Sequence, residues 1–95
     1  TIENYPHDYT VQANDYPRPW TTYAATKLFG EALGRWYHEK HGIEFVALRI
    51  GAFQNYDSPH LRHSAGLRKM WLSPRDCRGI LHAAIEREGI GYVLA

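Results

Sequence analysis

The hydrophobic positions of residues 22–41 follow the spacing of one helix face. Apolar side chains recur there at intervals of three and four residues, at Ala25, Leu28, Phe29, Ala32, Leu33 and Trp36. Thr21 or Thr22 can serve as the N-cap, and Gly42 is a typical C-terminal stop. Gly30 and Gly34 each cost the helix about 1 kcal/mol relative to alanine. Either they allow close approach to another backbone, or they are tolerated glycines on the surface.

A second amphipathic helix is predicted to begin after Ser73 and to end at Gly89. Ser73 suits the N-cap, and Pro74 suits the first helical position. The apolar positions form one stripe, made up of Cys77, Ile80, Leu81, Ala84 and Ile85. Because Cys77 lies on this stripe, we expect a buried and unreactive thiol.

Two further apolar runs, residues 43–50 and 90–95, are typical of buried strands. Their centres are continuously apolar, as in parallel strands that are covered on both faces. A helix, a short glycine turn and then a buried strand make up half of a βαβ unit. The pattern therefore predicts the α/β class, in one domain because 95 residues leave room for no more.

The other segments show no clear period. Residues 1–20 hold three prolines and several aromatic side chains, so we expect an irregular surface loop that packs over another part of the protein. Residues 52–72 are predicted to form a loop of about 20 residues, which exceeds the usual connection length and indicates a functional loop.

Composition excludes several classes of function. Eleven basic and ten acidic residues give a net charge of +1, so no nucleic-acid or membrane partner is expected. The longest apolar run, around residues 45–48, is too short to cross a bilayer, and the first residues do not resemble a signal peptide. A single cysteine fits a reducing compartment, which favours the cytoplasm.

Tyr23 and Lys27 stand four residues apart in the first predicted helix and so share a face. A free phenol titrates near pH ~10, and an ammonium group beside it favours the phenolate. The pair would then suit proton transfer with a hydroxyl or carbonyl substrate. Spacing alone leaves an alternative, an amphipathic helix with an exposed lysine and a half-buried tyrosine.

The flanking motifs extend this pattern over nearly the whole chain. They are Pro19-x-x-x-Tyr23-x-x-x-Lys27, Phe29-Gly30-Glu31, the Gly42 turn, Leu48-Arg49-Ile50-Gly51 and Trp71-Leu72-Ser73-Pro74-Arg75-Asp76. In this order they resemble the C-terminal half of an extended short-chain dehydrogenase/reductase of the NAD-dependent epimerase/dehydratase type. Arg49-Ile50-Gly51 and Trp71-Leu72-Ser73 are most similar to the uronate dehydrogenase branch, which oxidises aldohexuronic acids with NAD.

The resemblance implies the C-terminal part of a Rossmann-like, doubly wound parallel sheet, with NAD as cofactor and NADP left open. Tyr23 would be the catalytic acid/base, and Lys27 would lower the pKa of that phenol and hydrogen-bond the nicotinamide ribose. Tyr23, Lys27 and the main chain at Ile50, Gly51 and Ala52 would bind the cofactor. The substrate would be a small sugar or sugar acid, and the full-length protein a homo-oligomer.

Arg62 and Arg68 are the candidates for the carboxylate of a uronate, because an arginine fork can bind that group through two hydrogen bonds. The resemblance favours Arg62 and leaves Arg68 open. Both could also be solvated surface charges.

Two departures from the family pattern limit the resemblance. The chain has no glycine-rich dinucleotide loop, and the serine or threonine that completes the family's triad would precede Thr1. We therefore expect residues 1–95 to be one partial domain, the C-terminal half of the enzyme. Ala52 stands where the sugar-nucleotide enzymes of the family usually carry asparagine, which argues against a nucleotide-diphospho-sugar.

Other functions are weighed against this one. His38 with His41, and His60 with His63, have a spacing that could share a cation, but no third ligand follows in a recognisable pattern, so no metal is expected. A sugar or nucleotide-sugar epimerase or dehydratase, and a non-catalytic dinucleotide-binding homologue, are the alternatives. The intact pair of Tyr23 and Lys27 argues against the last.

Overall fold

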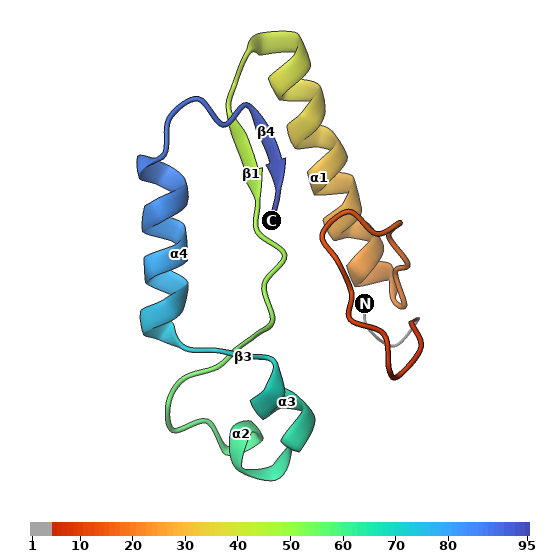
Figure 1. The fold of residues 1–95 in the computed structure, drawn as a ribbon, viewed down its shortest axis with the longest axis vertical. Helices are drawn as coiled ribbons and strands as arrows, with labels where there is room; N and C mark the ends of the chain where they lie inside the picture. Colours follow the sequence, from red (N-terminus) through yellow and green to blue (C-terminus); the bar gives the residue numbers. More distant parts are fainter. Residues whose placement is uncertain (1–4) are drawn as a thin grey trace. The chain divides into compact units, whose positions relative to one another are not determined.

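The computed structural model describes residues 5–95, and the chain forms two compact units (Figure 1). Unit 1 comprises Thr1–Leu48 and Gly89–Ala95. Unit 2 comprises Arg49–Glu88. Helices and short parallel strands occur in both units, so the predicted α/β class is confirmed.

Unit 1 contains the long helix α1, Thr22–His41. Thr21 is the N-cap, because its side-chain oxygen accepts a hydrogen bond from the Ala24 amide at 3.1 Å. Gly42 ends the helix in the left-handed conformation (φ 70°), and its amide donates to the His38 carbonyl at 2.9 Å. The predicted bounds of this helix are confirmed, and Thr21 rather than Thr22 is the cap.

The sheet of unit 1 pairs β1, Phe45–Ala47, with β4, Tyr92–Leu94. The two strands are parallel, with Phe45 opposite Tyr92, and α1 packs against both. The predictions of strands over 43–50 and 90–95 were right in type but too long. Each strand has only the other as its neighbour within residues 5–95, so their side chains are half-buried rather than covered on both faces.

Gly34 allows α1 to approach this sheet closely. It is the buried residue of α1, and a Cβ added there would collide with the ring of Phe45. The Phe45 ring in turn stacks on the Tyr92 ring, with centres 5.9 Å apart. By contrast, a Cβ added at Gly30 would meet nothing within 4 Å. Close approach therefore explains Gly34, against an aromatic ring rather than a backbone, whereas Gly30 is a surface glycine.

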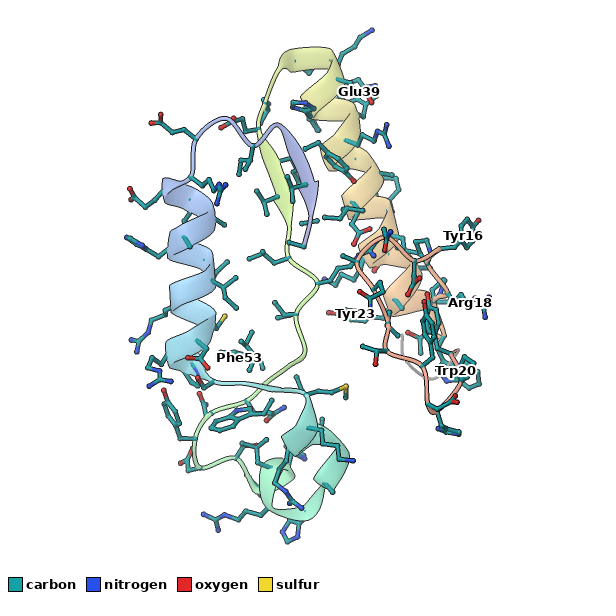
Figure 2. The ribbon with its side chains drawn as sticks, in the orientation of Figure 1. Tyr16, Arg18, Trp20, Tyr23, Glu39 and Phe53 are labelled. Carbon is teal, nitrogen blue, oxygen red and sulfur yellow. The ribbon has the colours of Figure 1, made fainter. Side chains whose placement is uncertain are left out.

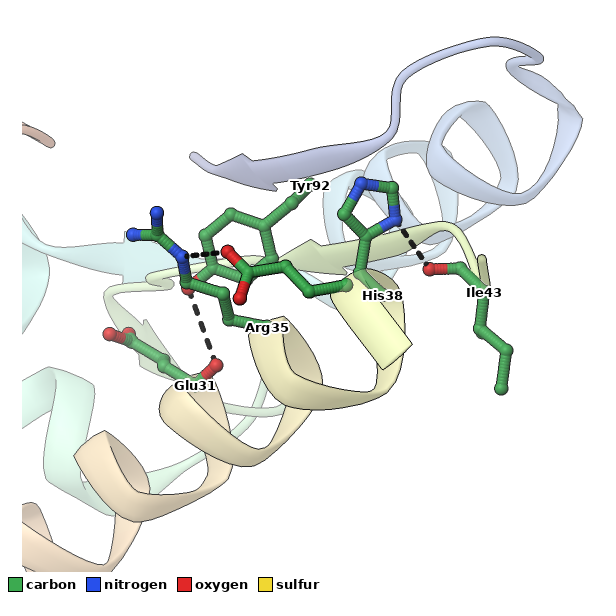
Figure 3. A network of polar contacts seen from close by, with 6 residues as sticks. Glu31, Arg35, His38, Ile43 and Tyr92 are labelled. Atoms are coloured by element: carbon green, nitrogen blue, oxygen red, sulfur yellow. Dashed lines mark hydrogen bonds and ion pairs between the residues drawn. The ribbon is translucent and has the colours of Figure 1, made fainter. Parts of the chain in front are cut away.

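Polar contacts join the same helix to β4 (Figure 3). The Tyr92 hydroxyl donates to the main-chain carbonyl of Glu31 at 3.3 Å, and the Arg35 guanidinium lies 5.7 Å from the centre of the Tyr92 ring. Arg35 also forms an exposed ion pair with Glu39 at 2.9 Å. Tyr92 is thus held by α1 through its ring and its hydroxyl.

In unit 2 the segment 52–72, which was predicted to be a loop, contains helices and strands, so that prediction was wrong. Strand β2, Ala52–Phe53, pairs in parallel with β3, Trp71–Leu72. Between them lie two helices of five residues each, α2 (Pro59–His63) and α3 (Ala65–Lys69). Helices this short span little more than one turn, so they leave no periodic pattern in the sequence.

Helix α4, Pro74–Glu86, completes unit 2. The Ser73 side chain accepts a hydrogen bond from the Asp76 amide at 3.1 Å, which confirms the predicted N-cap. The helix ends at Glu86, three residues before Gly89. Its apolar stripe is largely exposed, with Ile85 at 80%, and Cys77 is half-buried rather than buried.

Residues 5–20 contain no helix or strand, as predicted for this surface loop. Its aromatic side chains contact one another: the Tyr5 and Tyr9 rings stack with centres 5.8 Å apart, and the Tyr5 hydroxyl donates to the Tyr16 carbonyl at 2.6 Å. Tyr16 and Trp20 are exposed (Figure 2), so these two side chains do not cover another part of the chain. Among the residues described, no helix combines the length and the apolar character needed to cross a membrane.

Candidate active site

Tyr23 and Lys27 lie on one face in the first two turns of α1, as their spacing predicts. The Lys27 ammonium is 4.8 Å from the centre of the Tyr23 ring, within the range of a cation–π contact. Tyr23 is 69% exposed and Lys27 is also exposed, so both side chains are accessible to a ligand. The alternative, an amphipathic helix with a purely structural tyrosine, predicted that Tyr23 would be half-buried, and it is not.

The start of α1 positions this pair through local hydrogen bonds. The Thr21 cap fixes the first turn, and the Thr26 hydroxyl donates to the Tyr23 carbonyl at 2.6 Å. Because Tyr23 is the second residue of a capped 20-residue helix, its main chain is held in place while its side chain remains exposed.

Tyr9 is another exposed tyrosine of unit 1, but its environment is unsuited to proton transfer. A hydrogen bond from its hydroxyl to Asp15, at 2.8 Å, and the charge of that carboxylate raise the pKa of the Tyr9 phenol. A phenol held in its neutral form by an acceptor is a poor base. Tyr23 has no carboxylate partner of this kind among residues 5–95.

Ile50, Gly51 and Ala52, the residues expected at the nicotinamide, lie at the start of unit 2. They differ in the contacts and hydrogen bonds of their main chains. Gly51 is required by packing, because a Cβ there would collide with the Met70 carbonyl. The Ala52 amide already donates to that carbonyl at 2.8 Å. The main-chain groups of Ile50 and Gly51 make no hydrogen bond within residues 5–95, and both residues are exposed.

The two candidate substrate arginines have different surroundings in unit 2. Arg68 donates through Nη1 to the main-chain carbonyls of Leu61 and Arg62, at 2.8 and 3.1 Å. The exposed side chain of Arg62 has no hydrogen-bond or ion-pair partner within the part of the chain that the structure describes. Of these two arginines, Arg62 is therefore the one whose guanidinium is not engaged within residues 5–95.

Two buried serines that support unit 2 were not recognised as a pair from the sequence. Ser58 and Ser73 are 8% and 7% exposed, and each precedes a proline that opens a helix. The Ser58 hydroxyl donates to the side-chain oxygen of Gln54 at 2.7 Å, and the Gln54 carbonyl accepts from the Trp71 indole at 3.0 Å. The Ser-Pro signal that predicted α4 could also have predicted α2.

The histidine pairs do not form a metal centre within residues 5–95. No group of three or more His, Cys, Asp or Glu side chains able to hold a metal ion occurs there. The ring Nδ1 of His38 is instead 2.8 Å from the Ile43 carbonyl, in the turn that follows α1 (Figure 3).

The structure thus brings together Tyr23 with Lys27 in unit 1, and Arg68 with the main chain of Arg62 in unit 2.

No family model matches the chain, and no solved structure matches it. Curated proteins do. An NAD-dependent glucose-6-phosphate dehydrogenase from Haloferax volcanii is 37% identical over 82 residues, which cover 86% of this chain and 30% of that protein.

An L-arabinose 1-dehydrogenase (NAD(P)(+)) from the same organism is 39% identical, over 80% of this chain and 32% of that protein. A uronate dehydrogenase from Pseudomonas syringae is 29% identical over 95% of this chain and 31% of that protein. This chain is homologous to NAD(P)-dependent sugar dehydrogenases. The resemblance drawn from the motifs is confirmed at this level, and the chain spans about a third of the length of the curated relatives that it matches.

Proposed function

We propose that these residues are the catalytic, C-terminal part of an NAD-dependent sugar dehydrogenase of the extended short-chain type. The contact between the Lys27 ammonium and the Tyr23 ring, on an exposed face at the start of α1, is the observation that carries the proposal. It stands in a chain whose relatives are named as dehydrogenases of sugars and a sugar acid.

In this reaction a hydroxyl-bearing carbon of the sugar is oxidised to a carbonyl. Tyr23, as the phenolate, accepts the hydroxyl proton, and the carbon gives up a hydride, so that two protons and two electrons in all leave the substrate. NAD, when bound, supplies the hydride acceptor. Before this transfer the Lys27 ammonium favours the phenolate form of Tyr23, because opposite charges attract across this short i to i+4 spacing.

Each unit, taken by itself, offers groups suited to the nicotinamide side of the cofactor. Lys27 presents an exposed ammonium that can donate to ribose hydroxyls. Ile50 and Gly51 have main-chain groups that are not used within residues 5–95, so they can contact the nicotinamide, whereas the Ala52 amide is engaged with Met70. We infer that Ala52 contributes shape rather than a hydrogen bond.

The proposal includes the rest of the enzyme. A Rossmann-like sheet would add strands beside β1 and β4, which are paired only with each other within residues 5–95. A cytoplasmic location and a homo-oligomeric state belong to the same proposal. NAD is favoured over NADP by the names of the relatives, one of which uses either.

For the substrate, we propose a sugar that carries an acidic group, with a uronate as the first choice. The free guanidinium of Arg62 can bind a carboxylate through two charge-assisted hydrogen bonds. A sugar phosphate would use the same donor. One relative is named for glucose-6-phosphate and another for uronate, so both acids must be tested.

A steady-state assay of the complete protein tests this function. NAD or NADP is mixed with glucuronate, galacturonate, glucose-6-phosphate, glucose or L-arabinose, and the absorbance of the reduced cofactor is followed. We expect reduction of NAD with at least one of the acids, at a higher kcat/KM than with the neutral sugars. Binding of NAD without oxidation of any sugar in the panel would instead support the non-catalytic homologue.

A further inference from the structure

Helices α2 and α3 are joined by one residue, Ser64, which caps both. Its amide donates to the His60 carbonyl at 3.1 Å at the end of α2. Its hydroxyl accepts from the Leu67 amide at 3.2 Å at the start of α3. The two short helices therefore form one corner, with the residues around Ser64 at its apex.

A five-residue helix does little to stabilise its own C-terminal turn. Nucleation of a helix is unfavourable, and the carbonyls of the last turn have no partner inside the helix. In α2 the carbonyls of Leu61 and Arg62 belong to this last turn. Both accept hydrogen bonds from Nη1 of Arg68, which reaches back from α3 at 2.8 and 3.1 Å. Arg68 closes the end of α2.

This contact fixes the main chain on both sides of the Arg62 Cα. On one side Leu61 is the buried hydrophobic residue among residues 5–95, at 8% exposure, and it anchors α2. On the other side the Arg62 carbonyl is bound by Arg68. Between these two points the Arg62 side chain leaves the corner without an ion-pair or hydrogen-bond partner in residues 5–95.

We infer that Arg68 is a positioning residue, which holds Arg62 in the orientation that binds the anionic group of the sugar substrate. The inference rests on the proposed function. The two arginines would then have different roles. The Arg68 guanidinium is hydrogen-bonded to the main chain of the corner, whereas the Arg62 guanidinium is available to the ligand. The anion can be a carboxylate or a phosphate, since both accept from an arginine fork.

Hydrogen exchange of the complete protein, measured without substrate, tests the contact itself. Arg68→Met should raise the exchange rate of the amides in residues 61–68 several-fold, because the end of α2 loses its cap. Arg62→Met and Lys69→Met each remove a neighbouring positive charge without removing a hydrogen bond of the corner, and should leave the exchange of these amides unchanged. Unchanged exchange in Arg68→Met would overturn the inference whatever the enzyme's substrate is.

Kinetics test the positioning role. In Arg62→Met the ratio of KM for the acid to KM for the neutral sugar should rise about 10–100-fold, as expected for the loss of charge-assisted hydrogen bonds. Arg68→Met should raise the same ratio with little change in kcat, and Lys69→Met should not raise it. Comparing glucuronate with glucose-6-phosphate shows which acid the site recognises.

The double variant separates positioning from direct binding. If Arg68 acts only through Arg62, the variant that lacks both arginines should have the same ratio as Arg62→Met alone. Multiplied losses in the double variant would mean that Arg68 contacts the anion itself, and would contradict the inference. Altered exchange in Arg68→Met together with an unchanged ratio in Arg62→Met would contradict the proposed recognition of an acidic sugar, and the positioning role with it.

Discussion

Lys27, the lysine that we propose to be catalytic, has different surroundings from another lysine of the same helix. Its ammonium lies over the Tyr23 ring at 4.8 Å and remains exposed, so it can interact with the phenol and with a cofactor at once. Lys40, near the other end of the same helix, has no ring or carboxylate partner within residues 5–95. The two lysines offer a matched comparison on one helix.

We predict that Lys27→Met lowers kcat and raises KM for NAD by about 10–100-fold each, because a charge-assisted hydrogen bond of about 1.5–3 kcal/mol is lost. Lys40→Met, which removes the same charge from α1, should change neither value by more than about twofold. Steady-state kinetics with NAD as the varied substrate check both. Equal effects of the two substitutions would mean that Lys27 acts only as one of the positive charges of the surface.

What the sequence could show about single residues was limited to local chemistry. The pairing of Tyr23 with Lys27 was predictable because side chains at i and i+4 are neighbours on a helix face. The contact of Arg68 with the Leu61 and Arg62 carbonyls was not, because it joins two helices that have no periodic signature. Whether Tyr23, Lys27, Arg62 and Arg68 act as assigned stays a prediction.

The packing of α1 on its sheet depends on Gly34. This glycine faces the Phe45 ring, and that ring stacks on Tyr92 across the β1–β4 pair. Gly30, four residues earlier on the same helix, faces open space. The sequence could not tell these two glycines apart, because the difference lies in the strand that packs against the helix.

Substitution by alanine at the two glycines should change the free energy of unfolding in opposite directions. Gly34→Ala is expected to lower the free energy of unfolding of the complete protein by about 1–3 kcal/mol, since a methyl group is forced against the Phe45 ring. Gly30→Ala should raise it by up to about 1 kcal/mol, because alanine is the better helix former and meets nothing. Urea unfolding measures both; stabilisation by Gly34→Ala would refute the close packing.

Element boundaries were predictable where capping residues set them and not elsewhere. Thr21, Gly42 and Ser73 each act through one local hydrogen bond or one backbone conformation, and each was found in its predicted place. The predicted strand lengths were wrong because strand length depends on the neighbouring strand. The 52–72 segment was mistaken for a loop because α2 and α3 are each only five residues long.

Few hydrophobic side chains are buried among residues 5–95 as a whole. Leu61, at 8% exposure, is the only buried one, while Phe29, Trp36 and Ile85 are 68%, 49% and 80% exposed. These side chains lie on the helices α1 and α4, whose sequence pattern is that of helices with an apolar face. Faces of this kind need a covering layer, which the proposed larger dehydrogenase would provide.

We therefore predict that residues 1–95 expressed alone neither bind NAD tightly nor oxidise sugars, and that they associate through their exposed apolar side chains. Light scattering coupled to gel filtration would measure the association, and calorimetric titration the binding of NAD. A monomer that unfolds cooperatively and binds NAD with micromolar affinity would show that the chain needs no further layer.

The central claim is that Tyr23 is the acid/base of an NAD-dependent sugar oxidation, and Tyr23→Phe in the complete protein tests it most directly. Tyr37→Phe is the matched control, because it removes a hydroxyl from the same helix that has no hydrogen-bond partner within residues 5–95. We predict that kcat falls about 10²–10⁴-fold in Tyr23→Phe while the affinity for NAD stays within about threefold, and that Tyr37→Phe keeps its activity. A loss of less than about tenfold in Tyr23→Phe, or equal losses in both variants, would contradict the claim.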